Sequence, residues 1–105
     1  MRVRTVRLTI LLLAAFLGLA ACETAEERAQ RHFEAGMALL EEGDDRRALV
    51  EFRNVFKLDP THKEARLTYA RVSKDQGRMS EAYGQYLRVV EQYPDTTEAL
   101  IELSE

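Results

Sequence analysis

The chain repeats itself at a spacing of 34 residues, and this period constrains the fold more than any other feature. Conservative replacements keep the same spacing, since Phe52 becomes Tyr86, and Phe33 becomes Leu67 and then Ile101. A period of about 20 to 50 residues is typical of arrays whose repeats bury their apolar faces against their neighbours. We therefore expect a stack of repeated units. The identical pairs are Gly43 and Gly77, Ala48 and Ala82, Val55 and Val89, Pro60 and Pro94, Glu64 and Glu98, and Ala65 and Ala99.

Local signals divide each period into two helices. Gly43 and Gly77 interrupt the apolar pattern in mid-period, where a glycine can adopt the left-handed conformation that ends a helix. Pro60 and Pro94 close the second helix of each pair, because proline cannot continue the hydrogen-bond ladder. Three motifs with an N-cap oxygen and a glutamate three residues later mark helix starts. These motifs are Thr24-x-x-Glu27, Thr61-x-x-Glu64 and Asp95-x-x-Glu98. Together the signals predict helices at residues 24–42, 45–58, 61–76, 79–92 and 95–105.

Apolar residues in these segments recur at the helical spacing i, i+3, i+4, i+7. Small residues in the stripes let antiparallel helices approach closely, and no stretch keeps the alternation of a strand. With 105 residues the chain forms at most one small domain. The sequence therefore predicts an all-α fold. The stripes include Phe33, Gly36, Met37 and Leu40, then Leu49, Phe52, Val55 and Phe56, with small residues also at Ala48, Ala70 and Ala82.

At this point the sequence resembles the tetratricopeptide repeat, a 34-residue helix–turn–helix unit with an A-x₃-F…P pattern in its second helix. Ala48-x₃-Phe52…Pro60 matches this pattern, and the second copy matches with tyrosine in place of phenylalanine. The resemblance implies an α-solenoid of antiparallel helix pairs. Its units are a first repeat at 29–62, a second at 63–96 and an incomplete third repeat or capping helix at 97–105. His32, Arg66 and Ser73 depart from the family pattern, and we expect them to weaken packing in the first helices.

Residues 97–105 allow two interpretations. Solenoids of this type usually need about three units, and a polar-faced terminal helix can cap them. The alternative is that the sequence is a truncated piece of a longer repeat protein.

The N-terminus has the order of a secretory signal. Arg2, Arg4 and Arg7 precede an apolar run of 14 residues at 8–21. A membrane-spanning helix needs roughly 20 residues, which disfavours a permanent transmembrane helix.

Leu19-Ala20-Ala21-Cys22 resembles the lipobox of bacterial lipoproteins. The resemblance implies a signal peptide at 1–21, cleavage before Cys22, lipid on its sulfur and a tether at 22–28. The alternatives are a plain signal peptide or an N-terminal anchor helix. Glu23 is not the aspartate that in some lineages retains lipoproteins at the inner membrane, which favours the outer membrane.

The charge and the cysteine content of the chain exclude several kinds of function and site. Removal of the predicted signal peptide takes away Arg2, Arg4 and Arg7. The remaining chain has 12 basic and 18 acidic residues, so its net charge is −6 instead of −3. Nucleic-acid binding asks for a basic surface, so we expect none. A single cysteine excludes an intramolecular disulfide and a cysteine-based zinc site.

Catalytic patterns are also missing. His32 and His62 fit no metal-ligand spacing, and adjacent carboxylates such as Glu41 and Glu42 point about 100° apart on a helix. No serine lies in a pattern that resembles a triad. We expect no enzyme, cofactor, metal site or small-molecule substrate.

The resemblance implies a concave groove, lined by the first helix of each pair, that binds a protein or peptide partner. The alternative is that Phe33, Met37 and Leu40 only pack against neighbouring helices. The family's carboxylate-clamp subset is not indicated, because Phe33 and Met37 stand where its polar residues would be. The groove positions are Gln30, Phe33, Met37, Leu40 and Glu41 in the first repeat, and Glu64, Leu67, Arg71, Lys74 and Asp75 in the second.

These features together lead to one expected function and one alternative. We expect a lipid-anchored module on the periplasmic side of a bacterial envelope. It would act as an interaction scaffold in envelope assembly, secretion, or pilus or polysaccharide export. The alternative is a fragment or regulatory part of a longer repeat protein or enzyme complex.

Overall fold

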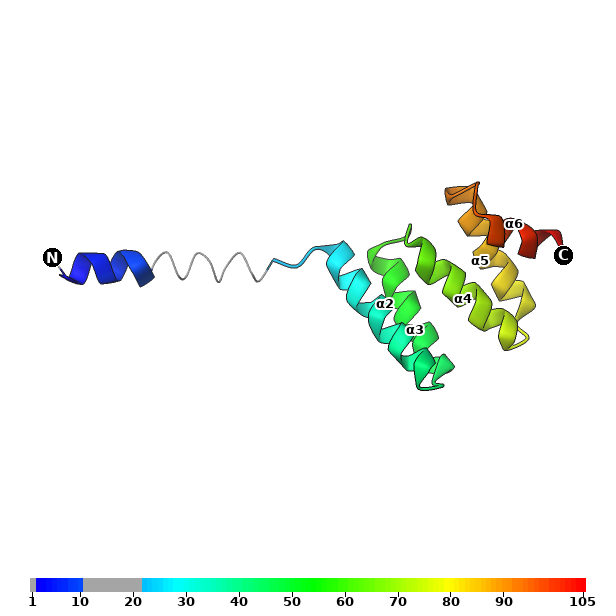
Figure 1. The fold of residues 1–105 in the computed structure, drawn as a ribbon, viewed down its shortest axis with the longest axis horizontal. Helices are drawn as coiled ribbons and strands as arrows, with labels where there is room; N and C mark the ends of the chain where they lie inside the picture. Colours follow the sequence, from blue (N-terminus) through cyan, green and yellow to red (C-terminus); the bar gives the residue numbers. More distant parts are fainter. Residues whose placement is uncertain (1, 11–21) are drawn as a thin grey trace.

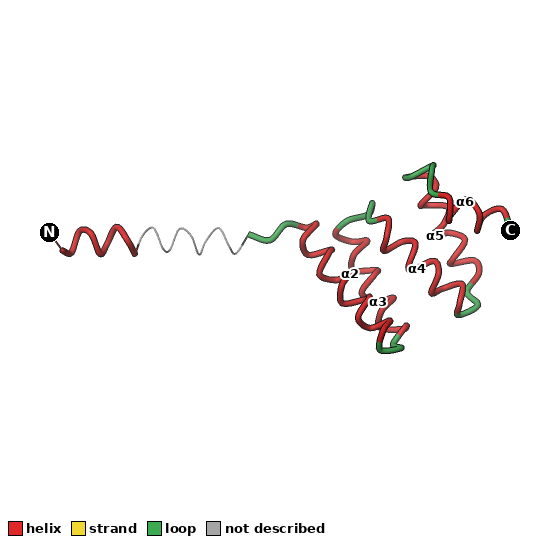
Figure 2. The backbone as a smooth tube through the Cα atoms, viewed as in Figure 1, coloured by secondary structure: helices red, strands yellow, loops and turns green. Residues whose placement is uncertain are grey.

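The computed structural model describes residues 2–10 and 22–105, and these residues form helices and no strand (Figures 1 and 2). Residues 2–10 are helical. The helices that follow are α2 (Ala25–Glu41), α3 (Asp45–Leu58), α4 (Lys63–Asp75), α5 (Met79–Gln92) and α6 (Thr97–Ser104). Each of these five lies within two residues of its predicted bounds, which confirms the all-α prediction for the described residues.

The helices form successive antiparallel pairs, α2 with α3 and α4 with α5, and α6 packs on the second pair (Figure 1). Gly43 and Gly77 end the first helix of each pair with φ values of 79° and 75°. A side chain with a Cβ is strained in this conformation, so the prediction for both glycines is confirmed.

One of the three predicted helix starts is confirmed and two are wrong. The Glu27 N–H donates to Thr24 Oγ1 at 3.1 Å, and the Thr24 N–H donates to the Glu27 carboxylate at 3.4 Å. The second start is displaced to His62, whose Nδ1 accepts from the Ala65 N–H at 3.1 Å. Thr61 does not cap α4, because its hydroxyl donates to the carboxylate of Asp59 in the preceding turn.

The third start is displaced in the same way. Thr96, rather than Asp95, precedes α6, and its side chain makes no cap hydrogen bond. The Thr96 hydroxyl donates instead to the Tyr93 carbonyl at 2.9 Å. At both displaced starts, a threonine hydroxyl bonds to the preceding turn and does not cap the helix.

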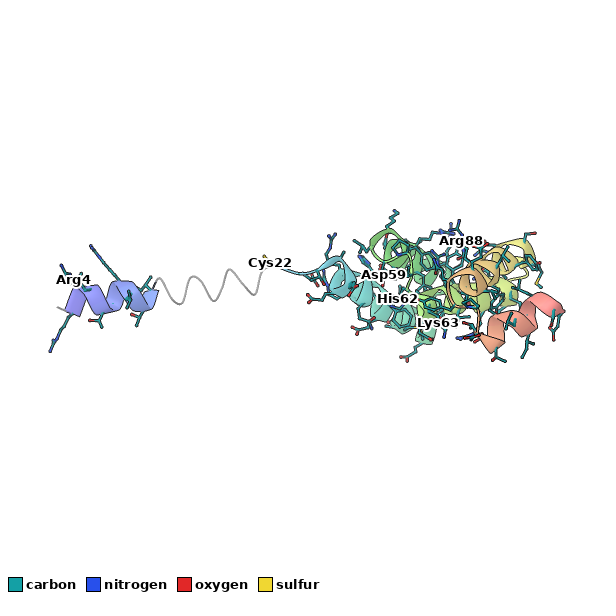
Figure 3. The ribbon with its side chains drawn as sticks, turned by 90° about the horizontal axis from the view of Figure 1, so that it is seen from above. Arg4, Cys22, Asp59, His62, Lys63 and Arg88 are labelled. Atoms are coloured by element: carbon teal, nitrogen blue, oxygen red, sulfur yellow. The ribbon has the colours of Figure 1, made fainter. Side chains whose placement is uncertain are left out.

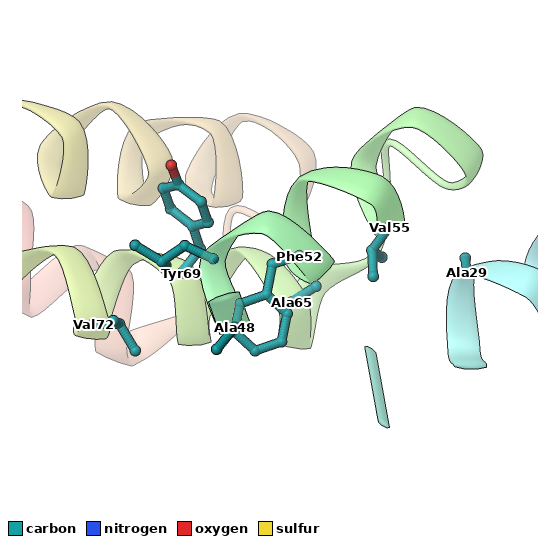
Figure 4. Packing of buried hydrophobic residues seen from close by; sticks show 8 residues of the cluster. Ala29, Ala48, Phe52, Val55, Ala65, Tyr69 and Val72 are labelled. Carbon is teal, nitrogen blue, oxygen red and sulfur yellow. The ribbon is translucent and has the colours of Figure 1, made fainter. Parts of the chain in front are cut away.

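The core consists of two clusters that repeat the same plan. Each has at its centre an aromatic residue of a second helix, Phe52 or Tyr86, and both side chains are buried. Gly36 lies against the Phe52 ring, since a Cβ at that position would fall 2.5 Å from Phe52 Cε1. The first cluster joins α2, α3 and α4 through Ala29, Ala48, Leu49, Phe52, Val55, Ala65, Tyr69 and Val72 (Figure 4). The second joins α4, α5 and α6 through Leu67, Ala70, Ala82, Tyr86, Val89 and Ala99.

The residues that depart from the family pattern behave differently from one another. Arg66 is buried, donates to the Pro60 carbonyl and to Gln85 Oε1, and stacks 4.3 Å from the centre of the Phe56 ring. The expectation that Arg66 weakens packing is therefore wrong, because its guanidinium is hydrogen-bonded and stacked, although burial lowers its pKa.

The other two residues that depart from the family pattern are His32 and Ser73. His32 Nδ1 lies 2.6 Å from Glu51 Oε2 and links α2 to α3. The Ser73 hydroxyl is buried and has no hydrogen-bond partner among the described residues. A buried unpaired hydroxyl costs about 1 to 3 kcal/mol, so a packing weakness is present at Ser73.

Candidate interaction surface

The first helices of successive repeats lie next to one another and form one continuous face. His62 Nε2 at the start of α4 lies 3.3 Å from Gln30 Oε1 on α2. Farther along the face, Arg71 on α4 contacts Glu98 on α6. We call the face formed by α2, α4 and α6 the first-helix face.

On α2, the three apolar groove candidates have different environments. Phe33 is half-buried, with its ring centre 6.0 Å from Phe52 and 4.8 Å from His62. Leu40 is half-buried against the first core cluster. Met37 is 38% exposed. Contacts with the first core cluster account for the partial burial of Phe33 and Leu40. Of these three residues, Met37 is the one whose apolar side chain is exposed.

The remaining apolar candidate, Leu67, belongs to the interior. It is 4% exposed and lies in the second core cluster with Tyr86 and Val89. The remaining polar candidates Gln30, Glu41, Glu64 and Asp75 are exposed.

The two cations of the predicted groove are held in ion pairs by α6. The Arg71 Nε and Nη2 atoms donate to the two carboxylate oxygens of Glu98, at 2.6 and 3.0 Å. The Lys74 Nζ donates to Glu102 Oε2 at 2.5 Å. The hydrogen bond to Glu98 raises the pKa of Arg71, and the bond from Arg71 lowers the pKa of Glu98. The positive charges of Arg71 and Lys74 are therefore neutralised within the domain.

A polar cluster that the sequence reasoning missed joins the two repeats. The Tyr69 hydroxyl accepts from Arg53 on α3, at 3.0 Å from Nη2, and donates to Glu81 on α5. Arg78 Nη1 contacts the same carboxylate at 3.0 Å. The bond from Tyr69 lowers the pKa of Glu81, whereas burial raises the pKa of Tyr69. Every charged group has a partner here, so the cluster fits a structural role.

A pocket of about 540 Å³ lies where the end of α4, the first half of α5 and the end of α6 meet. Its polar pair, Lys74 and Glu102, is joined by the ion pair described above. Its apolar walls include Met79, Tyr83 and Leu103. Neither histidine of the chain lines it, so the pocket contains no imidazole base.

No group of three histidine, cysteine, aspartate or glutamate side chains within residues 2–10 and 22–105 is arranged to hold a metal ion. Cys22 is a free, exposed thiol just ahead of α2 (Figure 3). Leu19, Ala20 and Ala21 of the predicted lipobox lie outside the described residues. Within the described ranges, no helix is both long and apolar enough to cross a membrane.

Comparison with known families agrees with the repeat architecture. A family model described as "Tetratricopeptide repeat" matches residues 39–103, which is more than half of the chain. A search of curated proteins gave no match. Tetratricopeptide repeats generally bind protein partners and are typically non-catalytic scaffolds. From the family match and the stacked helix pairs, the chain belongs to the tetratricopeptide repeat family.

Proposed function

We propose that this protein is a lipid-anchored scaffold on the periplasmic side of a bacterial envelope, and that its first-helix face binds a partner protein. The observation that carries the binding part is the exposure of Met37 between two anchored neighbours, Phe33 and Leu40. An exposed methionine on a rigid support offers an adaptable apolar contact, because its thioether chain fits irregular partner surfaces.

The partner's chemistry follows from the charges around Met37. Arg71 and Lys74 are already paired with glutamates of α6, so a partner carboxylate would have to displace one of them. We therefore propose a partner segment that contacts Met37 with an apolar side chain and needs no carboxylate. Affinity near the micromolar range is expected, because a short groove offers little area to offset association entropy.

The anchoring part of the proposal rests on Cys22. Its thiol is exposed and lies three residues ahead of α2, which leaves the sulfur accessible for acylation. Each buried acyl CH₂ contributes about 0.8 kcal/mol, and stable anchoring needs more than one chain. Two or three chains on one residue would hold the domain at the membrane, with the outer membrane favoured by Glu23. Such an anchor suits a scaffold for envelope assembly, secretion, or pilus or polysaccharide export.

The test is recovery of the partner from detergent-solubilised envelopes by wild-type protein and two variants. Met37→Glu places a charge on the proposed contact. Val50→Glu is the matched control, because Val50 is an exposed apolar residue on α3, outside the first-helix face. We expect Met37→Glu alone to lose the partner, with helical circular dichroism unchanged. Equal recovery by both variants would exclude the first-helix face as the binding site.

A further inference from the structure

The outer side of α3 carries a row of basic residues around one exposed apolar residue. Four exposed positions recur at i, i+4, i+7 and i+11, a spacing that places them on one side of a helix. The acidic residues of α3, Asp45 and Glu51, are both half-buried, and Glu51 is bonded to His32. We call the four exposed positions the α3 stripe, which consists of Arg46, Val50, Arg53 and Lys57.

Two of the three cations of the α3 stripe are free to bind an external anion. Arg46 and Lys57 have no hydrogen-bond or ion-pair partner in the part of the chain that the structure describes. Arg53 donates to the Tyr69 hydroxyl and lies 3.8 Å from Glu81, but 51% of its side chain stays exposed. The α3 stripe therefore presents local positive charge on a chain whose net charge is −3.

The repeat architecture does not require this charge. One period later, the same four positions lie on α5 and none of them is basic. These counterparts are Ser80, Gly84, Leu87 and Glu91. Since α5 occupies the same place in the second repeat without a basic row, the α3 stripe is a property of the first repeat alone.

One end of the α3 stripe lies next to the point where the proposed lipid anchor joins the domain. Because α2 and α3 are antiparallel, the end of α3 that carries Lys57 lies beside the start of α2 (Figure 1). Cys22 is three residues ahead of α2, and three extended residues span at most about 10 Å. An acylated Cys22 would therefore hold this end of α3 at the lipid surface.

The shape of the α3 stripe favours a lipid surface over a peptide. Side chains along one side of a single helix form a ridge, whereas peptides are recognised in grooves or at sheet edges. A ridge can lie flat on a bilayer, with Val50 at the boundary between headgroups and acyl chains and the cations at the phosphates. Each lysine or arginine near an anionic lipid surface strengthens attachment about fivefold.

We propose that the α3 stripe docks on anionic phospholipid of the membrane that holds the anchor. The proposal rests on the lipid anchor proposed above and adds the orientation of the domain. The α3 stripe and Met37 are exposed on different faces of the first repeat. Docking through α3 therefore leaves the first-helix face free for a partner protein.

The test uses tryptophan fluorescence, because the chain has no tryptophan and an introduced one reports a single position. Val50→Trp places the reporter on the α3 stripe, and Met37→Trp places it on the first-helix face as the matched control. Each protein is purified from bacterial membranes and reconstituted in vesicles whose brominated acyl chains quench tryptophan. The vesicles contain phosphatidylcholine alone or phosphatidylcholine mixed with phosphatidylglycerol.

We expect quenching at position 50 to exceed quenching at position 37 about twofold or more in the vesicles with phosphatidylglycerol, because the cations bind its phosphate. This difference should disappear in phosphatidylcholine alone. Arg46→Gln combined with Lys57→Gln in the Val50→Trp protein should also abolish it. Ala38→Glu combined with Thr97→Glu changes the net charge by the same amount at exposed positions of α2 and α6, and should preserve it.

Mass spectrometry of the same preparations separates this proposal from the anchor itself. Equal quenching at positions 37 and 50 in a protein whose Cys22 is acylated would overturn the docking and leave the anchor. An unacylated Cys22 would overturn both. Equal quenching together with a protein photo-crosslinked to position 50 would also overturn the docking, and would identify an acidic protein segment as the occupant of the α3 stripe.

Discussion

The guanidinium of Arg71 on α4 donates two hydrogen bonds to the carboxylate of Glu98 on α6, at 2.6 and 3.0 Å. This bidentate ion pair, together with the ion pair between Lys74 and Glu102, links the last helix to the second repeat. Since α6 is short, the ion pairs supplement an apolar contact that rests mainly on Ala99 and Leu103.

The Arg71–Glu98 contact predicts an acid-dependent stability. Arg71 lowers the pKa of Glu98 below its ordinary value of 4.5. The carboxylate therefore contributes stability that is fully present above about pH 4.5 and is lost as the pH falls through the lower native pKa. Glu98→Gln should lower the stability at pH 7 by about 0.2 to 1 kcal/mol, since the pair is partly exposed.

Thermal melts between pH 7 and pH 2.5 check this prediction. The difference between wild type and Glu98→Gln should shrink as the solution becomes more acidic. Glu91→Gln, at an exposed position of α5, serves as the control and should leave the melt unchanged at pH 7. A difference that stays constant across the pH range would mean that charge does not mediate the contact.

The central aromatic residue of the first core cluster should be indispensable. Phe52 is fully buried, and truncation of a buried phenylalanine costs roughly 3 to 5 kcal/mol. A small domain has only about 5 to 15 kcal/mol of stability, so Phe52→Ala should lose most or all of its cooperative melt. Val50→Ala, on the exposed side of the same helix, should melt like wild type. An unchanged melt in Phe52→Ala would show that the assigned repeat register is wrong.

Two helical glycines should respond in opposite ways to alanine. A Cβ on Gly36 would fall 2.5 Å from the buried Phe52 ring, whereas nothing lies within 4 Å of a Cβ on Gly84. Gly36→Ala should destabilise by about 1 to 3 kcal/mol through overpacking. Gly84→Ala should stabilise by about 0.5 to 1 kcal/mol through helix propensity. Chemical denaturation measures both, and a stabilised Gly36→Ala would show that α2 and α3 pack less closely than described.

Lipid attachment makes a separate prediction for Cys22. A palmitate analogue fed to a bacterial host that expresses the chain should label the wild type, and Cys22→Ser should remain an unlabelled precursor. The expected mass difference between the processed and unprocessed forms is visible by electrophoresis. Equal labelling of both proteins, or labelling of neither, would contradict the anchor.

The internal period predicted the helices well, because the signals that define them are local. The bounds of α3 and α5 agree with the prediction at both ends, since glycine precedes each helix and proline follows it. The N-caps of α4 and α6 were each displaced by one residue, and the hydroxyls of Thr61 and Thr96 bond to groups of the preceding turns instead of capping a helix.

The partners of the charged side chains could not be predicted in the same way. Sequence patterning placed Arg71 and Lys74 on the correct helix, but their partners lie 27 and 28 residues away on α6. Which carboxylates they meet depends on how α4 and α6 cross, and a periodicity does not encode that angle. The contact between Tyr69 and Arg53 went unnoticed for the same reason, since it depends on how the two repeats stack.

Binding of a partner protein by the first-helix face is tested most directly by site-specific photo-crosslinking in cells. A photoreactive amino acid replaces Met37 in one protein and Val50 in another, because both positions are exposed and lie on different faces. We expect a discrete crosslinked band from position 37 and none from position 50. A band from position 50 with none from position 37 would contradict it, and would move the binding site to the face formed by the second helices.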